Sequence, residues 1–282
     1  FSGTLTKIER GARRVITSLL FEADAVDEYV DFGTLDARVA SADDIKAKLL
    51  ESGCWPFIMQ RPYHIIANPE TTPRDIFISA FTSVPISNNY NFTLQGKEKE
   101  LQAAITALSK LTTGSIHLGV EKGSKSPFDS IEGVKKYTVS GPHPAGNVGT
   151  QMNAIAPVNK GELVWTVNAQ DLVIIGELLL TGKYNAERIV ALTGSEVKKP
   201  QYYRTRIGAE VATIIYDAGL KEENVRVISG DVLTGTKIAL DQHLGVYDTT
   251  VTIIPEGDDY ELFGWNKPVF DKISTSRALT FS

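Results

Sequence analysis

The sequence predicts an α/β fold, in which a wound α/β domain is followed by a β-grasp module. Residues 41–181 alternate apolar strands with amphipathic helices, which is typical of a sheet covered by helices. Residues 183–246 then follow the order strand, strand, helix, strand, and one helix on one face of a small sheet is typical of a β-grasp module. At roughly 150 residues per domain, 282 residues have room for about two domains.

Composition excludes several classes of protein. With 42% hydrophobic and 22% charged residues, the chain has an ordinary globular balance, which excludes disordered and fibrous proteins. The net charge of −5 opposes attraction to phosphate backbones, so we expect no nucleic-acid partner. The single cysteine, Cys54, excludes an intrachain disulfide and a cluster with four cysteine ligands. The apolar runs fall short of the roughly 20 residues that cross a bilayer, so we expect no direct membrane span.

The N-terminal part predicts strands and then a helix. Residues 2–21 carry alternating and paired apolar positions, which predict short strands that need a partner sheet. A helix is predicted from Ser41 to Gly53, because Ser41 and Asp44 can cap its start and Gly53 can end it. The chain begins at Phe1, with neither a leader nor a methionine, and we expect an excised fragment rather than an intact precursor.

The next elements complete the first domain. Trp55-Pro56-Phe57 and Arg61-Pro62 should interrupt regular structure, and residues 75–81 predict a strand buried on both faces, which favours a parallel sheet. Residues 97–110 predict an amphipathic helix that ends before Gly114. The remaining predicted elements are strands at 115–120, 137–139 and 163–167 and an apolar helix at 172–180.

The second half predicts smaller elements. Strands are expected at 188–192, 202–206 and 225–228, and a helix at 209–217. The chain then returns to strands at 249–254 and 260–263, with residues 255–258 as a hairpin connection. We expect that this tail can pair with residues 2–21.

The loop Gly141–Thr150 is the most unusual stretch of the chain. Gly141 and Gly146 have the spacing of a phosphate-binding loop, but the lysine and hydroxyl residue of that motif are missing and two prolines remove amide donors. Alternatively, the prolines stiffen a tight connection and Gly146 and Gly149 allow close backbone approach. A third alternative is contact with a ligand or partner, with His143 as a polar tip.

The stretch Trp165–Asp171 joins a strand to a helix, and α/β sheets bind ligands at such strand ends. The indole of Trp165 and the amide of Gln170 are therefore candidate ligand contacts. The alternative is that Trp165 packs in the core and Asn168 or Asp171 caps the helix.

Metal and cysteine chemistry are not expected. The chain has no HExxH motif and no cysteine paired with a histidine, so a metal site is not predicted. Cys54 stands beside Trp55 and Pro56 at a predicted helix end, where a small packed thiol is the expected role. The four histidines lie far apart in the sequence: His64, His117, His143 and His243.

Several stretches, in this order and spacing, resemble one family. They are GPHPAGNVGT (141–150), WTVNAQDLVIIG (165–176), ERIVALTG with VKKPQYYRTRIGAEV (187–211), VRVISGDVLTGTK (225–237) and ELFGW (261–265). Together they resemble the A subunit of the sodium-translocating NADH:quinone reductase, Na+-NQR, over nearly the whole chain. The resemblance implies a remnant of an N-terminal barrel-sandwich domain, a Rossmann-like α/β domain, a β-grasp module of the SLBB type and a β tail, at 1–38, 39–182, 183–246 and 247–282. The N-terminal and C-terminal strands would form a partial β barrel-sandwich.

This family is similar in fold to the flavin-carrying subunit of respiratory complex I and to the C subunit of Rnf complexes. In those relatives a glycine-rich turn after the first helix lets backbone amides reach FMN, whereas bulky residues occupy Gly53–Phe57 here. The resemblance therefore implies that this chain binds no cofactor of its own. The complex as a whole would use NADH, flavins, iron–sulfur centres and quinone.

The resemblance implies a peripheral subunit on the cytoplasmic face of the bacterial inner membrane. It would contribute to ubiquinone binding, hold the membrane-embedded subunits and have no catalytic residue of its own. A quinone needs an apolar, aromatic-lined slot with hydrogen-bond donors for its carbonyl oxygens. The residues expected to provide this slot are His143, Trp165, Gln170 and Trp55, with Gly141, Gly146 and Gly149 shaping the loop.

Two other functions stay open from the sequence. The fold alone is compatible with a flavin-dependent NADH dehydrogenase. The second alternative is a purely structural scaffold, in which the 141–150 loop and the β-grasp module dock neighbouring proteins of the complex.

Overall fold

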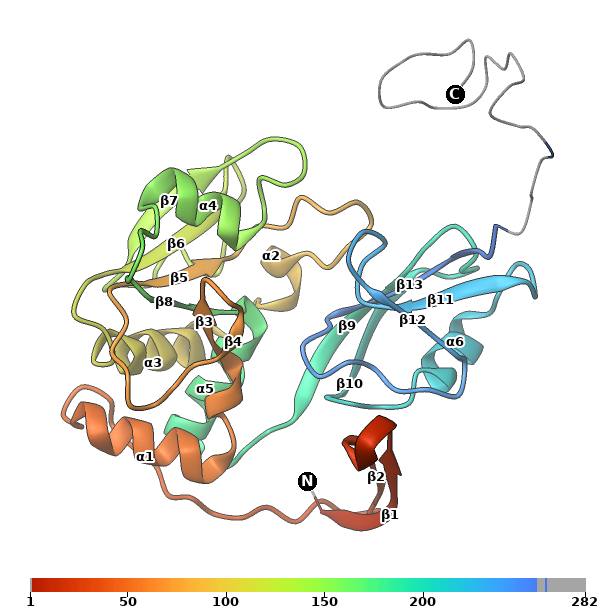
Figure 1. The fold of residues 1–282 in the computed structure, drawn as a ribbon, viewed down its shortest axis with the longest axis horizontal. Helices are drawn as coiled ribbons and strands as arrows, with labels where there is room; N and C mark the ends of the chain where they lie inside the picture. Colours follow the sequence, from red (N-terminus) through yellow and green to blue (C-terminus); the bar gives the residue numbers. More distant parts are fainter. Residues whose placement is uncertain (1, 258–261, 263–282) are drawn as a thin grey trace.

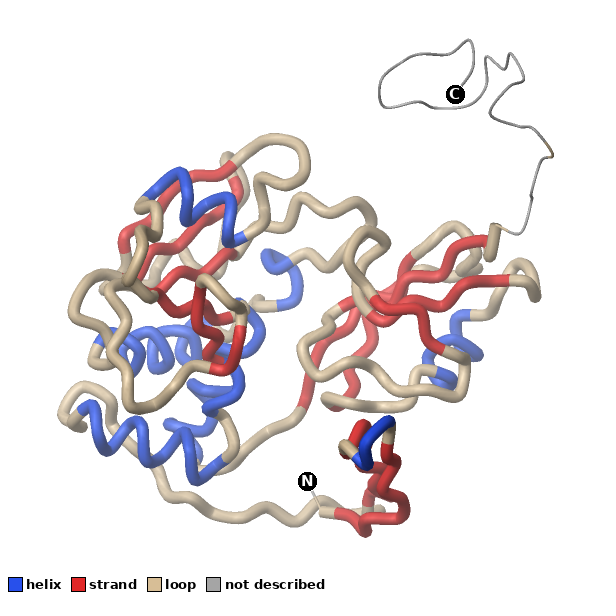
Figure 2. Tube along the Cα trace, in the orientation of Figure 1, coloured by secondary structure: helices blue, strands red, loops and turns tan. Residues whose placement is uncertain are grey.

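The computed structural model describes residues 2–257 and Leu262, and it divides into an N-terminal hairpin and two α/β units (Figure 1). We call residues 42–181 the α/β domain and residues 187–255 the β-grasp domain. Figure 2 shows that the strands of these two domains form two distinct sheets. The fold class predicted from the sequence, α/β with a β-grasp module, is confirmed. The expected strand at 260–263 and the end of its hairpin connection lie outside the described residues.

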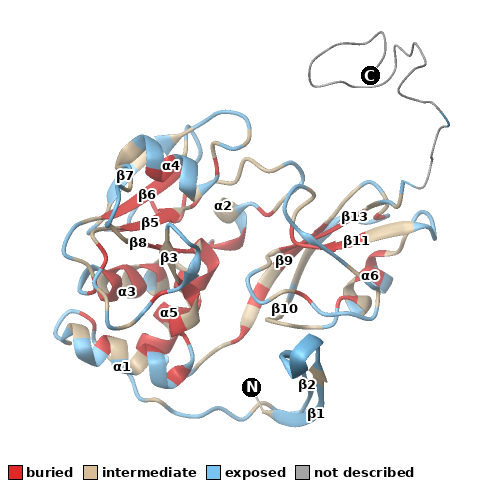
Figure 3. Ribbon diagram, in the orientation of Figure 1, coloured by how far each residue is buried: buried red, intermediate tan, exposed pale blue. Residues whose placement is uncertain are grey.

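The N-terminal hairpin consists of β1 (Gly3–Arg10) and β2 (Ile16–Ala23), which pair antiparallel around the short turn η1 (Ala12–Arg14). It forms a two-stranded sheet of its own. Most of its surface is exposed (Figure 3), and its large apolar side chains are between 44% and 61% exposed: Leu5, Ile8, Val15, Ile16, Leu19 and Phe21. The strands predicted here are therefore present.

The sheet of the α/β domain has the strand order β4-β3-β8-β5-β6-β7. The four strands from β8 to β7 in this order are parallel, and β3 and β4 extend the sheet antiparallel at one edge. The bounds are β3 (Ile58–Arg61), β4 (Ile65–Ile66), β5 (Ile76–Ser79), β6 (Ile116–Glu121), β7 (Lys135–Val139) and β8 (Val164–Val167).

Helices cover both faces of this sheet (Figure 1). The helices of the domain are α1 (Ala42–Ser52), α2 (Tyr90–Thr93), α3 (Glu98–Ser109), α4 (Val148–Ile155) and α5 (Ala169–Thr181). Ile76 and Ile78 of β5 belong to the main core with α1, α3 and α5, whereas Phe77 between them packs with Met152 of α4. The central strand is thus buried on both faces, as its continuous apolar sequence predicts.

Local signals explain where the two main helices begin and end. Ser41 and Asp44 form a reciprocal capping box at the start of α1, and Gly53 ends it in a left-handed conformation with φ 78°. Asn168 caps α5 by accepting a hydrogen bond from the Gln170 amide, and Gly182 ends that helix at φ 73°. The prediction that Ser41 and Gly53 bound the first helix is confirmed.

The β-grasp domain has the strand order β10-β9-β13-β11-β12 with α6 (Ala212–Ala218) beside it. Its strands are β9 (Glu187–Thr193), β10 (Gln201–Arg206), β11 (Val225–Ser229), β12 (Thr236–Ile238) and β13 (Thr250–Pro255). The expectation that residues 249–254 belong to a tail that pairs with residues 2–21 is wrong. β13 pairs parallel with β9 and antiparallel with β11, where it buries Val251 and Ile253 in the domain core.

Candidate functional site: a cavity between the two domains

The α/β domain has a topological switch point between β5 and β8. From β5 the chain passes α3 and moves outward to β6 and β7, and it then passes α4 on the opposite face and returns to β8 on the other side of β5. Because the two connections leave opposite faces, the carboxyl ends of β5 and β8 separate into a crevice, which is where open α/β sheets bind ligands.

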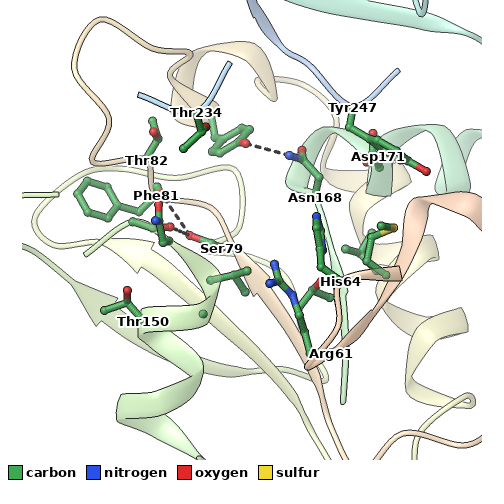
Figure 4. A pocket seen from close by; sticks show the side chains of 18 of the residues that line it. Arg61, His64, Ser79, Phe81, Thr82, Thr150, Asn168, Asp171, Thr234 and Tyr247 are labelled. Atoms are coloured by element: carbon green, nitrogen blue, oxygen red, sulfur yellow. Dashed lines mark hydrogen bonds between the residues drawn. The ribbon is translucent and has the colours of Figure 1, made fainter. Parts of the chain in front are cut away.

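A cavity of about 680 Å³ lies at this crevice (Figure 4). Its walls come from the ends of β3, β5 and β8, from the start of α4, and from two residues of the β-grasp domain, Thr234 and Tyr247. The remaining lining residues are Phe57, Met59, Arg61, His64, Ser79, Phe81, Thr82, Tyr90, Gly146, Asn147, Val148, Gly149, Thr150, Thr166, Val167, Asn168 and Asp171. A ligand here would therefore touch both domains.

Gly146 brings the 141–150 loop against the end of β5. The Ser79 hydroxyl donates to the Gly146 carbonyl over 2.8 Å, and the Gly146 amide donates to the Ser83 hydroxyl over 2.8 Å. A Cβ at Gly146 would overlap the Ser83 amide and lie 2.9 Å from the Phe81 carbonyl oxygen, so only glycine fits without a backbone shift. By contrast, a Cβ at Gly149, which lines the cavity, would meet no described atom within 4 Å.

The loop uses its own amides internally. The Ala145 and Asn147 amides donate to the carbonyls of Pro142 and Pro144, and Gly141 takes φ 126° to start the turn. These amides are therefore not free to cradle a phosphate. The loop leads into α4, which begins at Val148 with Asn147 at the N-cap, and no side chain caps its start.

The tryptophan pair predicted to contact a ligand lies behind the cavity wall. Trp165 is fully buried and Trp55 is 3% exposed, and their rings meet edge to face at 5.5 Å. The Trp55 indole donates to the Ala67 carbonyl, whereas no described residue accepts from the Trp165 indole. Because side chains alternate along β8, Thr166 faces the cavity and Trp165 joins the core beneath α5.

Gln170 and His143 also lie outside the cavity lining. The Gln170 amide group donates to the Ile189 carbonyl over 2.9 Å and accepts from the Ile189 amide over 3.3 Å, so it joins α5 to β9. His143 Nδ1 lies 3.4 Å from the Ser83 hydroxyl. The structure thus brings Gly146 and Gly149 into the cavity, but not the four side chains expected to contact a quinone.

Arg61 and His64 are the functional candidates that the sequence reasoning missed. Arg61 is the last residue of β3 and His64 lies in the turn between β3 and β4, and both side chains line the cavity (Figure 4). Arg61 is half-buried, its buried Nε has no hydrogen-bond partner within residues 2–257, and no described carboxylate pairs with it. Burial lowers the pKa of Arg61, and partial burial together with the Arg61 charge lowers the pKa of His64. The sequence signal was present in Arg61-Pro62-Tyr63-His64, in which a cation and a titratable imidazole flank a proline turn.

The acid that lines the cavity is already paired. Arg188 Nη2 of β9 lies 2.5 Å from Asp171 Oδ1 of α5, with both side chains buried. Burial raises the pKa of Asp171 to about 6, against the attraction of Arg188. Since Asp171 is matched by Arg188, the positive charge of Arg61 is left without compensation in the described cavity.

Aromatic rings supply the apolar part of the wall. Phe57 is buried in the turn η2 (Trp55–Phe57), and Phe81 and Tyr90 are half-buried. The Asn168 amide donates to the Tyr90 hydroxyl over 3.2 Å, and the Tyr247 hydroxyl donates to the Pro56 carbonyl over 3.0 Å. The cavity therefore combines flat apolar surfaces with a small number of fixed polar groups, as small-molecule sites do.

Cys54 is a packing residue, and the described side chains offer no metal site. Cys54 is buried, and burial raises its pKa to about 12, so the thiol stays protonated at neutral pH. Within the described part of the chain, no three His, Cys, Asp or Glu side chains are arranged to hold a metal ion. None of the helices in that part has the length and apolar character needed to cross a bilayer.

The fold resembles that of a much larger enzyme. A chain of the NAD+-reducing [NiFe]-hydrogenase superposes with a TM-score of 0.57 in its air-oxidised state, at 13% identity, over 78% of this chain and 47% of that one. Its H2-reduced state gives a TM-score of 0.52 over 76% and 47% of the two chains. At this identity the likeness concerns the fold alone.

Closer relatives share both sequence and order of elements. The A subunit of the Na(+)-translocating NADH-quinone reductase of Vibrio atlanticus (strain LGP32) is 36% identical over 98% of this chain, and that of Neisseria meningitidis serogroup B (strain ATCC BAA-335 / MC58) is 35% identical over 98%. The chain spans 62% of the length of each of these relatives.

Two family models match the two domains in turn. The model described as the NqrA second alpha/beta domain matches residues 40–184, which is just over half of the chain, and the NQRA C-terminal domain model matches residues 189–239. The chain therefore belongs to the NqrA family, the A subunits of the Na(+)-translocating NADH-quinone reductase.

Proposed function

We propose that this chain serves as the NqrA component of a sodium-translocating NADH:quinone reductase and contributes a quinone-binding cavity to it. The cavity between the domains is the observation that carries this proposal. Its volume of about 680 Å³ suits a substituted quinone ring, and Phe57, Phe81 and Tyr90 offer flat apolar contacts. Arg61 and His64 supply donors for a carbonyl oxygen.

The remaining activities follow from the family and are part of the same proposal. Electrons from NADH and the movement of sodium would be handled by other subunits, and this chain would sit on the cytoplasmic face of the bacterial inner membrane. The relatives named above are subunits of such a reductase, which supports a partner-bound state for this chain.

A flavin fits the cavity less well than a quinone does. The turn after α1, where a glycine-rich segment would let a flavin approach the backbone, holds the buried rings of Trp55 and Phe57 and the ring of Pro56. The phosphate group of FMN would also meet the 141–150 loop, whose Ala145 and Asn147 amides already donate hydrogen bonds to carbonyls of that loop. These contacts support a protein without a flavin of its own.

A calorimetric titration of the 282-residue chain with a short-chain ubiquinone, with FMN titrated in parallel, tests the proposal. We expect saturable binding of the quinone and none of FMN. Gly149→Leu should weaken quinone binding, because the added side chain enters open space at the cavity wall. Ala103→Leu, which adds bulk to a separate groove beside α3, is the matched control and should bind normally. Saturation by FMN, or equal quinone affinity in both variants, would overturn the proposal.

A docking role has one observation in its favour. The apolar side chains of the β1–β2 hairpin, Leu5, Ile8 and Leu19 among them, are about half exposed on a sheet of two strands. An isolated two-stranded sheet is marginally stable, so a covering protein surface would stabilise it. Under this second candidate, Leu5→Ser with Ile8→Ser should abolish assembly with the membrane-embedded subunits in a pull-down and leave quinone affinity unchanged.

A further inference from the structure

We propose that Arg61, with His64 beside it, binds a negatively charged ring oxygen, so that the cavity selects anionic quinones over neutral ones. This inference rests on the proposed quinone site and names the chemical form of the ligand that it prefers. It also assigns the residue that makes the distinction.

The placement of Arg61 comes from the register of β3. Side chains alternate along a strand, so Met59 and Arg61 project on the same side of the sheet, and both line the cavity. The neighbouring Gln60 lies on the opposite side of the strand, where its side-chain oxygen accepts from the Asn68 amide. Arg61 thus reaches the cavity from a sheet strand rather than from a loose loop.

His64 is held beside Arg61 by an uncommon backbone conformation. Its φ of 53° lies in the left-handed region, which residues with a side chain seldom adopt. This conformation closes the turn between β3 and β4 and sets the exposed imidazole at the cavity mouth (Figure 4). Strained residues of this kind persist where the surroundings fix them, and they are concentrated at ligand sites.

The charges around the cavity do not balance. Within residues 2–257 no carboxylate lies within ion-pair distance of Arg61, and the Asp171 carboxylate is already paired with Arg188. Arg61 Nε is buried and makes no hydrogen bond to a described residue. A buried donor without an acceptor costs free energy, so an anionic acceptor from the ligand would recover that cost.

The surrounding groups favour a flat ring over a bare inorganic ion. Phe57, Phe81, Met59 and Val167 line the same cavity as the polar groups, and an inorganic ion would not contact these apolar side chains favourably. A ring that carries an ionised hydroxyl combines an apolar face with a charged edge. The guanidinium can donate two parallel hydrogen bonds to such an edge.

Calorimetry with a matched pair of ligands tests this inference. The ligands are 2-hydroxy-1,4-naphthoquinone, which is ionised at neutral pH, and 2-methyl-1,4-naphthoquinone, which is neutral and of similar size. We expect the anionic ring to bind about 10- to 100-fold more tightly, the factor of one charge-assisted hydrogen bond. Arg61→Gln should weaken binding of the anionic ring more than binding of the neutral ring and so remove this preference, whereas Arg61→Lys should retain part of it.

Controls separate this inference from the quinone site on which it rests. Arg38→Gln removes an equal charge from an exposed ion pair with Asp36, outside the cavity lining, and should keep the preference. Equal affinity for both rings in the unmodified chain, or a preference that survives in Arg61→Gln, would overturn the inference while the quinone site stands. Failure of both rings to bind would overturn the quinone site itself. Competition by inorganic phosphate at equal affinity would show an anion site without ring recognition, which also contradicts the inference.

Discussion

Arg188 of the β-grasp domain and Asp171 of the α/β domain form a buried ion pair, with Nη2 and Oδ1 2.5 Å apart. The Arg188 atoms Nε and Nη1 are buried and have no hydrogen-bond partner among the described residues. The positive charge of this guanidinium is therefore neutralised by Asp171. Gln170, one residue before Asp171, makes two hydrogen bonds to Ile189, one residue after Arg188. The start of α5 is therefore fixed to β9 by two consecutive residues on each side, and one of the four, Asp171, also lines the cavity.

Removing the acid from this pair should destabilise the protein severely. Asp171→Asn leaves the Arg188 charge buried and unpaired, and we expect the free energy of unfolding to fall by about 3–5 kcal/mol. Replacing both residues, Asp171→Leu with Arg188→Met, should recover most of that loss because no buried charge remains. Urea unfolding followed by circular dichroism measures both values. A double variant as unstable as Asp171→Asn would contradict this account of the pair.

Removing Arg188 should make stability depend more steeply on pH. Burial raises the pKa of Asp171 from 3.8 to about 6, so the folded state holds its proton more tightly than the unfolded state does. The corresponding stability is present below about pH 4 and is lost as pH rises through the folded pKa. In Arg188→Met the attraction of the cation is gone, so the folded pKa rises further and the loss extends above pH 6.

We therefore expect Arg188→Met to be destabilised more at pH 8 than at pH 5, relative to the unmodified chain at each pH. Thermal unfolding midpoints at the two pH values measure the difference. The variant that also carries Asp171→Asn has no titrating carboxyl at this position, so, relative to the unmodified chain, it should be destabilised no more at pH 8 than at pH 5. The same destabilisation of Arg188→Met at both pH values would show that Asp171 does not titrate in this range.

Elements with local signals could be predicted from the sequence, and those fixed by distant pairing could not. Ser41 and Gly53 bound α1 through their own hydrogen bonds and backbone conformation, so a short window of sequence was enough. β13 comes after both β11 and β12 along the chain, yet it is inserted between β9 and β11. Its apolar run identifies a strand but not its neighbours.

The helix α4 was missed although its sequence carries a pattern. Val148, Met152 and Ile155 recur at helical spacing and pack beside Phe77, but the glycines and prolines before them indicated a loop throughout. Without α4, the loop's place at the crevice between β5 and β8 could not be foreseen.

Which side chain of β8 contacts the cavity could not be predicted from the sequence. β8 is buried at every position, so its sequence has no polar alternation that tells which side chains face the crevice. Trp165 was one of the four expected ligand contacts, whereas its neighbour Thr166 lines the cavity. Arg61 ends the short strand β3 and His64 stands in the turn before β4, around a proline where propensity predicts no strand.

The two glycines of the 141–150 loop should respond oppositely to the same change. Gly146→Ala forces a methyl group against the Ser83 amide and the Phe81 carbonyl, which should cost about 1–3 kcal/mol of unfolding free energy. Gly149→Ala places its methyl in open space within α4, where alanine favours the helix by up to about 1 kcal/mol. Urea unfolding of both variants provides the comparison. Equal destabilisation by the two changes would mean that the loop does not approach β5 as described.

The affinity for an anionic quinone should rise as pH falls. The pKa of His64 lies below its ordinary value of 6.5, so the ring is mostly neutral at pH 7.5 and gains charge at lower pH. An anion bound beside it favours the protonated form, and by linkage protonation favours the anion. The other charged groups that line the cavity are Arg61, which stays charged, and Asp171, whose pKa is raised to about 6 and which adds to the trend when it is protonated. The hydroxyls of Tyr90 and Tyr247 have raised pKa values and stay neutral.

Calorimetric titrations with 2-hydroxy-1,4-naphthoquinone between about pH 7.5 and 5.5 separate the two contributions. His64→Gln keeps a hydrogen-bonding side chain that cannot be protonated, so it should show a smaller rise in affinity than the unmodified chain, with only the Asp171 part left. The neutral 2-methyl ring should bind equally at all pH values, because it carries no charge for either group to attract. Identical pH profiles for His64→Gln and the unmodified chain would place His64 outside the charge field of the ligand and leave Arg61 as the single cation that holds it.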